Sequence, residues 1–274
     1  MQGELLDKWR TDLAAWAIPE HITAAVTDSP WVLPRRVFAR RADRLMAAPA
    51  GASYERATDA LGPGGTVLDI GAGAGAACLP LATHATAVTA VDTDQDMLTL
   101  LAERATAAGM DLRTVQGSWP EAAAQVGPAD VVTCHNVVYN VPEIWDFLVA
   151  LTNHARRRVV VELTAAHPLT SLNPLWLRFH GLQRPDGPTA ADLLAILAGA
   201  GLSAGHTEWN RPAEADYAGF AELIDVTRRR LCLPADRASE VEAALLDLGS
   251  QRERPGDLGS SGRNVVTIWW EGTA

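Results

Sequence analysis

The sequence predicts an α/β protein with a mostly parallel sheet and helices on both faces. From residue 66 onward, short apolar runs that are typical of strands alternate with helix-like segments. Three glycines, Gly71, Gly73 and Gly75, stand on alternate positions directly after the first run. The second run ends in Asp92, about twenty residues further on, where an acidic side chain is suited to bind a ribose diol. These observations predict a cofactor site at the carboxyl ends of the strands.

Length and composition exclude several classes of protein. A chain of 274 residues with 48% hydrophobic and 20% charged residues is long enough for one large domain, or for a domain with a cap. Its net charge of −10 argues against a general nucleic-acid-binding protein, which would be basic. Three scattered cysteines without CxxC spacing support neither a disulfide framework nor a zinc site. Because we find no signal-like segment and no apolar run of membrane length, we expect a cytoplasmic protein without membrane contacts.

Residues 1–61 are expected to form a helical cap in front of a core over residues 62–274. Apolar residues follow helical spacing in residues 5–16, and further helices are predicted near Pro19 and after Pro34. We interpret the cap as a lid over the cofactor, with plain core packing as the alternative. The third helix carries five arginines on its polar side, which we interpret as a solvated face: Arg35, Arg36, Arg40, Arg41 and Arg44.

The strands and helices of the core follow in order along the chain. Strands are predicted at 66–70, 87–91, 111–115, 130–134, 158–163, 202–209 and 264–270. The apolar series in residues 76–81 predicts a helix directly after the glycine loop, and Asp94 and Pro142 each open another. Thr189 and Asp192 form a capping-box-like start for the next helix. The last two helices are predicted at 214–231 and 237–248.

The glycine loop itself leaves two cofactors open. Glycine allows a sharp turn and a close approach of a ligand to the backbone. A helix after the turn would present unpaired N–H groups and the positive end of its dipole. Because Gly71-x-Gly73-x-x-Ala76 also satisfies the relaxed dinucleotide pattern, an NAD-type oxidoreductase stays an alternative. That class requires a separate catalytic half, of which the sequence gives no sign.

Four segments resemble the class I S-adenosyl-L-methionine (SAM)-dependent methyltransferases. They are VLDIGAGAG at 67–75, AVDTDQDML at 90–98, VQGSWPEA at 115–122 and DVVTCHNVVYNVPE at 130–143. By resemblance they are the glycine loop, the ribose-binding acid, the adenine-edge segment and the segment beside the methionine end. The likeness implies a Rossmann-like sheet of seven strands whose last strand runs antiparallel. It also implies SAM as the cofactor and in-line methyl transfer as the activity.

The resemblance and the positions after the strands together give the candidate site residues. The cofactor-binding set that the resemblance implies is Asp69, Gly71, Ala72, Gly73, Gly75, Asp92, Thr93, Met97, Gly117, Ser118, Trp119 and His135. Because a hydroxyl or ammonium acceptor must lose a proton, we expect His135 or His167 to act as a general base. The candidate substrate-binding residues are Tyr139, Trp176, His180 and Arg184.

The acceptor is expected to be a small molecule. An RNA- or rRNA-associated methyltransferase or a SAM-binding protein without activity is the other alternative, supported only by clustered arginines at 156–158 and 228–230. Cys134 and Glu162 echo the cytosine-C5 methyltransferases, but Thr133 replaces the proline of that family. No spacing of histidines indicates a metal site. The sequence does not predict the oligomeric state.

Overall fold

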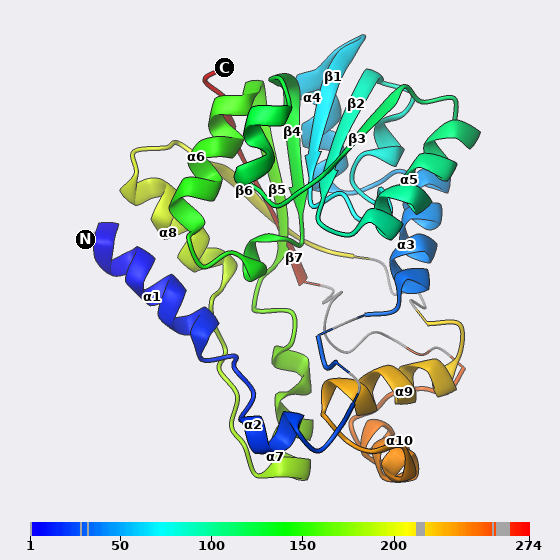
Figure 1. Cartoon of the computed structure of the whole chain (residues 1–274). Helices are drawn as coiled ribbons and strands as arrows, with labels where there is room; N and C mark the ends of the chain where they lie inside the picture. The colour runs from blue at the N-terminus through cyan, green and yellow to red at the C-terminus, as the bar shows by residue number, and fades with distance from the viewer. Residues whose placement is uncertain (1, 28, 32, 212–216, 254, 256–263) are drawn as a thin grey trace.

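The computed structural model describes residues 2–27, 29–31, 33–211, 217–253, 255 and 264–274. Seven strands form one sheet in the order β3-β2-β1-β4-β5-β7-β6 (Figure 1). They are β1 (Gly65–Ile70), β2 (Ala85–Asp92), β3 (Leu112–Gln116), β4 (Ala129–His135), β5 (Ala155–Thr164), β6 (Gly205–Asn210) and β7 (Asn264–Glu271). Strands β1 to β5 are parallel, and β7 is antiparallel to both of its neighbours. The predicted mostly parallel sheet of seven strands is therefore confirmed.

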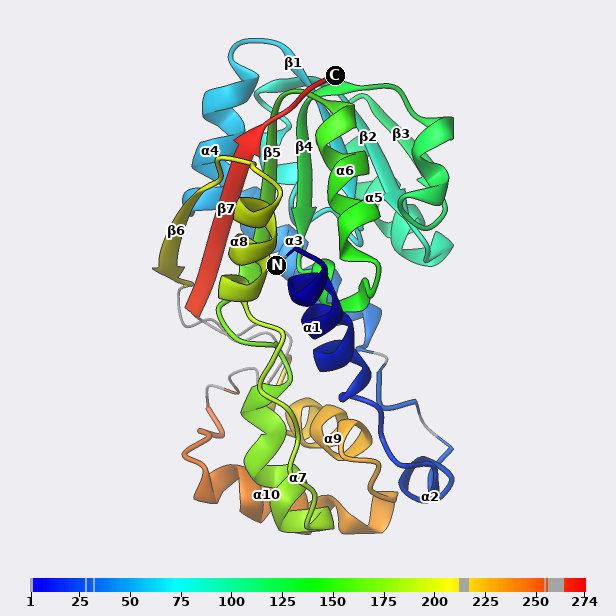
Figure 2. The same ribbon diagram turned by 90° about the vertical axis from the view of Figure 1, so that its left-hand side faces the viewer.

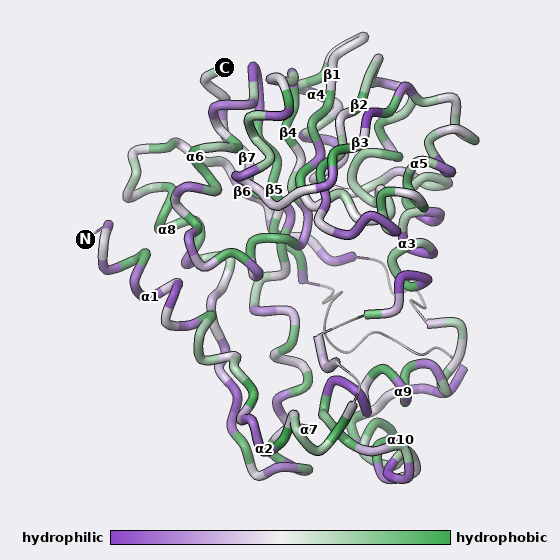
Figure 3. The backbone as a smooth tube through the Cα atoms, in the orientation of Figure 1, coloured by the Kyte–Doolittle hydropathy of each residue, from purple (hydrophilic) through white to green (hydrophobic). Residues whose placement is uncertain are grey.

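Helices cover both faces of the sheet (Figure 2). On one face, α1 (Gln2–Ala14), α6 (Ile144–His154) and α8 (Ala190–Gly199) share an apolar cluster with the strands. On the other face, α3 (Arg35–Ala47), α4 (Ala52–Leu61) and α5 (Gln95–Ala107) form a second cluster. Because β4 and β5 are covered on both sides, most residues of β4 and of the second half of β5 are buried. Most of these residues are hydrophobic (Figure 3).

A third apolar cluster lies beyond the carboxyl ends of the parallel strands, in the lower part of Figure 1. Its helices are α2 (Glu20–Thr23), α7 (Asn173–His180), α9 (Phe220–Arg230) and α10 (Ala238–Asp247). Short 3-10 helices are η1 (Leu79–Leu81), η2 (Glu121–Gln125), η3 (Val138–Asn140), η4 (Thr170–Leu172) and η5 (Ala235–Arg237). The edge of the sheet formed by the carboxyl ends of the parallel strands therefore faces a second layer of helices.

The N-terminal segment contributes to all three clusters. Trp9 of α1 lies in the first, Ala42 and Ala57 lie in the second, and Ile22 and Val37 lie in the third. Its helix α4 packs directly against β4 and β5. A role of this segment as a lid stays a prediction.

The main difference from the predicted elements follows the glycine loop. Instead of the predicted α-helix, residues 71–78 form turns and Leu79–Leu81 a single 3-10 helix. Pro80 removes one backbone donor, and Gly75, with φ of 95°, departs from helical geometry. The dipole of an α-helix is therefore not available at this loop.

Most other element starts agree with the prediction. Asp94 caps α5 and Thr189 caps α8, where both bonds of the capping box with Asp192 are present. The helix expected at Pro142 begins two residues later, at Ile144. Of the predicted helix 214–231, residues 214–216 lie outside the described part of the chain, and α9 begins at Phe220.

Candidate active site

Two adjoining cavities open at the carboxyl ends of β1 and β4. At this point the strand order reverses direction, which is where open α/β sheets bind their ligands. The first cavity has a volume of about 480 Å³ and the second of about 750 Å³. Phe38, Arg41, Asp94, Asn136 and Asn140 line both. The two cavities are therefore neighbouring parts of one site.

The glycine loop forms the floor of the first cavity. Gly71 and Gly73 have φ of 68° and 53°, in the left-handed region that favours glycine. A Cβ on Gly71 would lie 2.2 Å from a methyl carbon of Val137, so no side chain fits there. Gly75 faces away from this cavity, because a Cβ there would lie 2.4 Å from Leu101.

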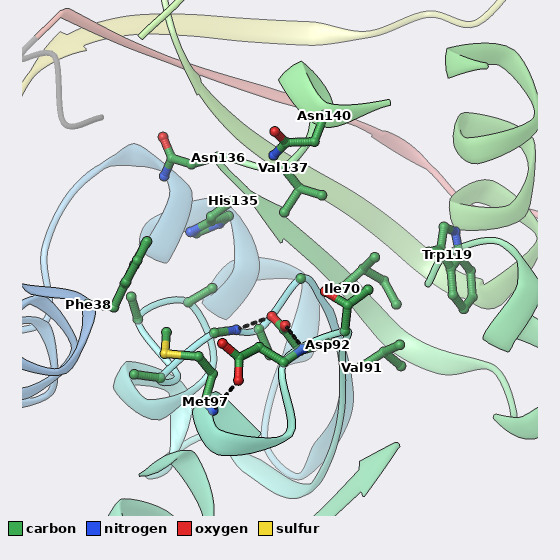
Figure 4. A pocket seen from close by; sticks show the side chains of 18 of the residues that line it. Phe38, Ile70, Val91, Asp92, Met97, Trp119, His135, Asn136, Val137 and Asn140 are labelled. Carbon is green, nitrogen blue, oxygen red and sulfur yellow. Dashed lines mark hydrogen bonds between the residues drawn. The ribbon is translucent and has the colours of Figure 1, made fainter. Parts of the chain in front are cut away.

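Asp92 ties the loop to the end of β2 (Figure 4). One carboxylate oxygen accepts the N–H of Gly73 at 2.7 Å, and the other accepts the N–H of Asp94 at 2.9 Å. Each oxygen keeps a second lone pair, so the carboxylate still has capacity to accept two ligand hydroxyl groups. The side chain is thereby held in position before any ligand binds.

The walls of the first cavity are mostly apolar. Phe38 and Met97 line one side, and Ile70 and Val91 line another (Figure 4). Trp119 is 8% exposed and belongs both to the lining and to the first apolar cluster, where its ring meets His154 edge-on. It therefore serves as core and as cavity wall.

Ten of the twelve predicted cofactor residues line the first cavity. They are Gly71, Ala72, Gly73, Asp92, Thr93, Met97, Gly117, Ser118, Trp119 and His135. Asp69 and Gly75 do not. Asp69 is fully buried below the loop, where it accepts the hydroxyl of Thr133 at 2.8 Å, and burial raises the pKa of its carboxyl group. Its position therefore points to support of the loop from below.

A cluster of polar side chains lies at the carboxyl ends of β4 and β5. The Nε2 atom of His135 is buried and makes no hydrogen bond with the described residues. Nearby, Glu162 accepts bonds from Arg211 and from the hydroxyl of Ser53, the latter at 2.6 Å. Burial alone would raise the pKa of Glu162, but Arg211 and then His135 outweigh it and lower the pKa to about 2. The carboxylate is therefore ionised throughout the neutral range.

The second cavity contains two of the predicted residues, Tyr139 and His167. The hydroxyl of Tyr139 is bound to Thr164 at 2.7 Å, and burial raises its pKa. His167 stacks on Trp16, with ring centroids 4.0 Å apart, and its Nδ1 accepts the N–H of Leu169 at 3.3 Å. The neutral ring therefore carries its proton on Nε2. Burial, and then the charge of Arg184, lower the pKa of His167 to about 3.

The other three predicted substrate residues do not line either cavity. Arg184 lies over the rings of Trp16 and Trp176 and donates to the backbone oxygens of Ala17, at 3.0 Å, and of Trp16. His180 is bonded to the backbone oxygen of Leu231 at 2.6 Å. These contacts join the N-terminal segment, α7 and the end of α9.

Several lining residues were not predicted. Arg41 was expected on a solvated face but is only 7% exposed, which corrects that interpretation. It lies one turn after the buried Val37, and this spacing is a signal that the sequence does contain. Arg211 lies far from every motif. Arg230 belongs to the arginine cluster at 228–230, but no local pattern marks it as a cavity residue.

Comparisons with known proteins agree with this fold. Residues 67–158 match a family model described as a methyltransferase domain. The YcgJ protein from Bacillus subtilis is 16% identical, with a TM-score of 0.51 over 86% of this chain and 99% of that chain. A protein from Bacillus halodurans C-125, named as a methyltransferase, is also 16% identical, with a TM-score of 0.50 over 81% of this chain and 97% of that one.

A third solved structure is less similar in shape. It is the magnesium protoporphyrin IX methyltransferase ChlM from Synechocystis PCC 6803 with bound SAH, 22% identical, with a TM-score of 0.47 over 64% of this chain and 78% of that chain. A search of curated proteins found no match.

Among the described residues, no group of three or more His, Cys, Asp or Glu could hold a metal ion. Nor does any helix in that part of the chain combine the length and apolar content that crossing a membrane requires.

Proposed function

We propose that this chain is a class I SAM-dependent methyltransferase and that it methylates a small molecule bound in the second cavity; residues 67–158 match a methyltransferase domain. The observation that carries the proposal is the continuity of the two cavities. The first is built on the glycine loop and Asp92, and the second opens from it at shared lining residues. An acceptor in the second cavity can therefore approach a methyl group held in the first.

The residues of the first cavity fit SAM. The carboxylate of Asp92 is held rigidly by two backbone N–H groups and can still accept both ribose hydroxyls. The close packing of Gly71 against Val137 leaves backbone rather than a side chain at the cavity floor. The volume of about 480 Å³ lies within the range of pockets for ligands of this size. When bound, SAM supplies a methyl group on a sulfonium leaving group.

The chain's own residues then have three tasks. They align the acceptor with the transferred methyl group, exclude water and, for a hydroxyl or ammonium acceptor, remove a proton. We assign the last task to His135, because its buried Nε2 has no protein partner among the described residues and it lines the first cavity together with Glu162. His167 remains the second candidate, although its Nδ1 already accepts a bond from Leu169.

Calorimetric titration with S-adenosylhomocysteine (SAH), the demethylated cofactor, tests the proposal. Asp92→Asn replaces one carboxylate oxygen by an amide N–H₂ group, which cannot accept a hydrogen bond, and leaves the other oxygen a weaker, uncharged acceptor. The variant therefore binds the N–H of Gly73 and the ribose hydroxyls less well. We expect SAH affinity to fall by about tenfold or more. Asp96→Asn is the matched control, because Asp96 lies only four residues further along, in the first turn of α5, and its carboxylate pairs with Arg35 on the surface.

The outcomes separate the rival functions. The proposal is supported if the unaltered chain binds SAH, Asp92→Asn has a lower affinity for SAH, and Asp96→Asn keeps the affinity of the unaltered chain. No heat with either SAM or SAH, or binding of NADH in their place, contradicts it.

A further inference from the structure

The second cavity contains a buried positive charge at its far end. Arg230, the last residue of α9, lines this cavity and is 7% exposed. Its Nη1 atom makes no hydrogen bond with any described residue. A buried guanidinium is unfavourable unless acceptors or an opposite charge complete its bonds. A ligand in the cavity that accepts a hydrogen bond from Arg230 would therefore stabilise this buried guanidinium.

The neighbouring Arg184 is an arginine of the same region whose hydrogen bonds are made within the protein. It is also buried, but two backbone oxygens, of Trp16 and Ala17, accept its hydrogen bonds. Rings of Trp16 and Trp176 lie against its guanidinium. Within the described residues, the Nε atom of Arg184 makes no hydrogen bond, but both of its Nη atoms do, whereas Arg230 forms no hydrogen bond or ring contact of this kind.

The other charges around the cavity do not neutralise Arg230. Asp94 carries the one carboxylate among the described lining residues, and it pairs with Arg35 at 3.0 Å. Arg41 lines the junction of the two cavities, and Arg10 pairs with Glu143 at 2.8 Å. Among the described lining residues, Arg230 therefore has no acidic partner, although the whole chain has a net charge of −10. A buried cation without an acidic partner favours an anionic ligand.

Between Arg230 and the first cavity the lining is largely apolar and partly aromatic. It includes Trp16, Leu33, Phe38 and Leu169. Flat aromatic walls of this kind favour a ring-shaped, apolar ligand body. Phe38 also lines the first cavity, whereas Arg230 does not, so the charged end lies away from the cofactor.

We propose that the acceptor is an anionic compound with an apolar ring body, whose carboxylate binds Arg230 and whose methylated atom lies at the junction with the first cavity. This inference rests on the proposed function, because it assumes that the first cavity holds the methyl donor. A guanidinium binds a carboxylate with two parallel hydrogen bonds, which orients the ligand as well as attracting it.

A pair of probes that differ only in charge tests the inference. The whole chain, saturated with SAH, is titrated calorimetrically with 2-naphthoate and with its neutral analogue 2-naphthamide. We expect the acid to bind at least about tenfold more tightly than the amide. Arg230→Gln should remove this preference, and Arg230→Met serves as a second variant without charge. Arg229→Gln is the control, because Arg229 adjoins Arg230 in α9 but pairs with Asp225.

The outcomes distinguish this inference from the proposed function. Loss of the acid preference in the Arg230 variants, with SAH affinity unchanged, supports it. Equal binding of acid and amide by the unaltered chain overturns it and needs no variant. No binding of naphthoate to the SAH-loaded chain, or an unchanged preference in Arg230→Gln, also overturns it. Absence of SAH binding to the unaltered chain would instead contradict the proposed function itself.

Discussion

Gly71 and Gly109 share a left-handed backbone conformation, with φ of 68° and 67°, but only Gly71 is crowded. A Cβ at Gly109 meets nothing within 4 Å. Gly109→Ala should therefore lower the free energy of unfolding by about 1 kcal/mol, which is the cost of placing alanine in a left-handed conformation. In Gly71→Ala the new Cβ also overlaps Val137, and we expect a further loss of about 1–3 kcal/mol. Urea unfolding of the two variants measures both terms.

Binding separates the two glycines further. Gly71→Ala should weaken SAH binding, because Val137 and the loop must move apart, whereas Gly109→Ala should leave the affinity unchanged. Equal losses of stability and affinity in the two variants would contradict a close approach of Val137 to the loop.

The two candidate bases also differ at this scale. If His135 removes the acceptor's proton, His135→Ala should lower turnover by about 10²–10⁴-fold and leave SAH affinity intact. His167→Ala should act mainly on acceptor KM, because His167 presents a proton donor and stacks in the second cavity. Turnover is measured with any acceptor that supports methylation. A change below about threefold in both variants would exclude a histidine base.

Single residues were predictable from the sequence where a local pattern marks them. Gly73 and Asp92 stand in recognisable motifs, and the structure brings them into direct contact at 2.7 Å. Arg211 and Arg230 reach the site through tertiary packing alone. Neither lies at a spacing that distinguishes it from the other arginines, so only the fold reveals its position.

The capping box of α8 offers a prediction at the scale of one element. Thr189 accepts the N–H of Asp192 at 3.3 Å, and Asp192 accepts both the N–H and the hydroxyl of Thr189 at 2.8 Å. We expect Thr189→Ala to destabilise the protein by about 1 kcal/mol, because both bonds of the Thr189 hydroxyl are lost. Guanidinium unfolding gives the value. Thr99→Ala is the control, since that exposed hydroxyl only bonds back to Gln95 within α5; a loss as large as that of Thr189→Ala would argue against capping.

Elements were predicted well where capping residues and periodic apolar residues agree, as in α5 and α8. The helix expected after the glycine loop was wrong because its apolar spacing was weighed without the effect of Pro80. The bounds of the strands were close, since buried parallel strands are marked by continuous apolar residues. The order in which the strands pair was not predictable in the same way, because it depends on contacts between segments that are distant in the sequence.

For the whole molecule, His167 predicts sensitivity to mild acid. Its pKa is lowered from 6.5 to about 3 in the folded protein, first by burial, so the unfolded chain takes up this proton earlier as the pH falls. The stability contribution is complete above pH 6.5 and is lost between about pH 6.5 and 3. At pH 5 the loss is about 2 kcal/mol.

Unfolding free energies at pH 7 and pH 5 test this prediction. His167→Gln should reduce the difference between the two values by about 2 kcal/mol. His206→Gln, at an exposed position on β6, should leave the difference as it is. An unchanged difference in His167→Gln would show that another group causes the acid sensitivity.

The helices beyond the sheet show how widely separated parts of the chain build one layer. Ile22, Trp176, Leu223 and Val241 all lie in the third apolar cluster. The sequence predicted amphipathic helices in the N-terminal and C-terminal parts but gave no sign that they meet. Their shared position next to the second cavity is a property of the complete fold.

The place of β7 also affects how the protein is made. It lies between β5 and β6, so β6 joins the sheet only through the segment Asn264–Glu271. During synthesis the ribosome delivers this segment after all the other strands, and it must insert beside strands already assembled. We therefore expect the nascent chain to expose the unpaired edge of β5 until residues 264–271 have left the ribosome, which makes it a client for chaperones during that interval.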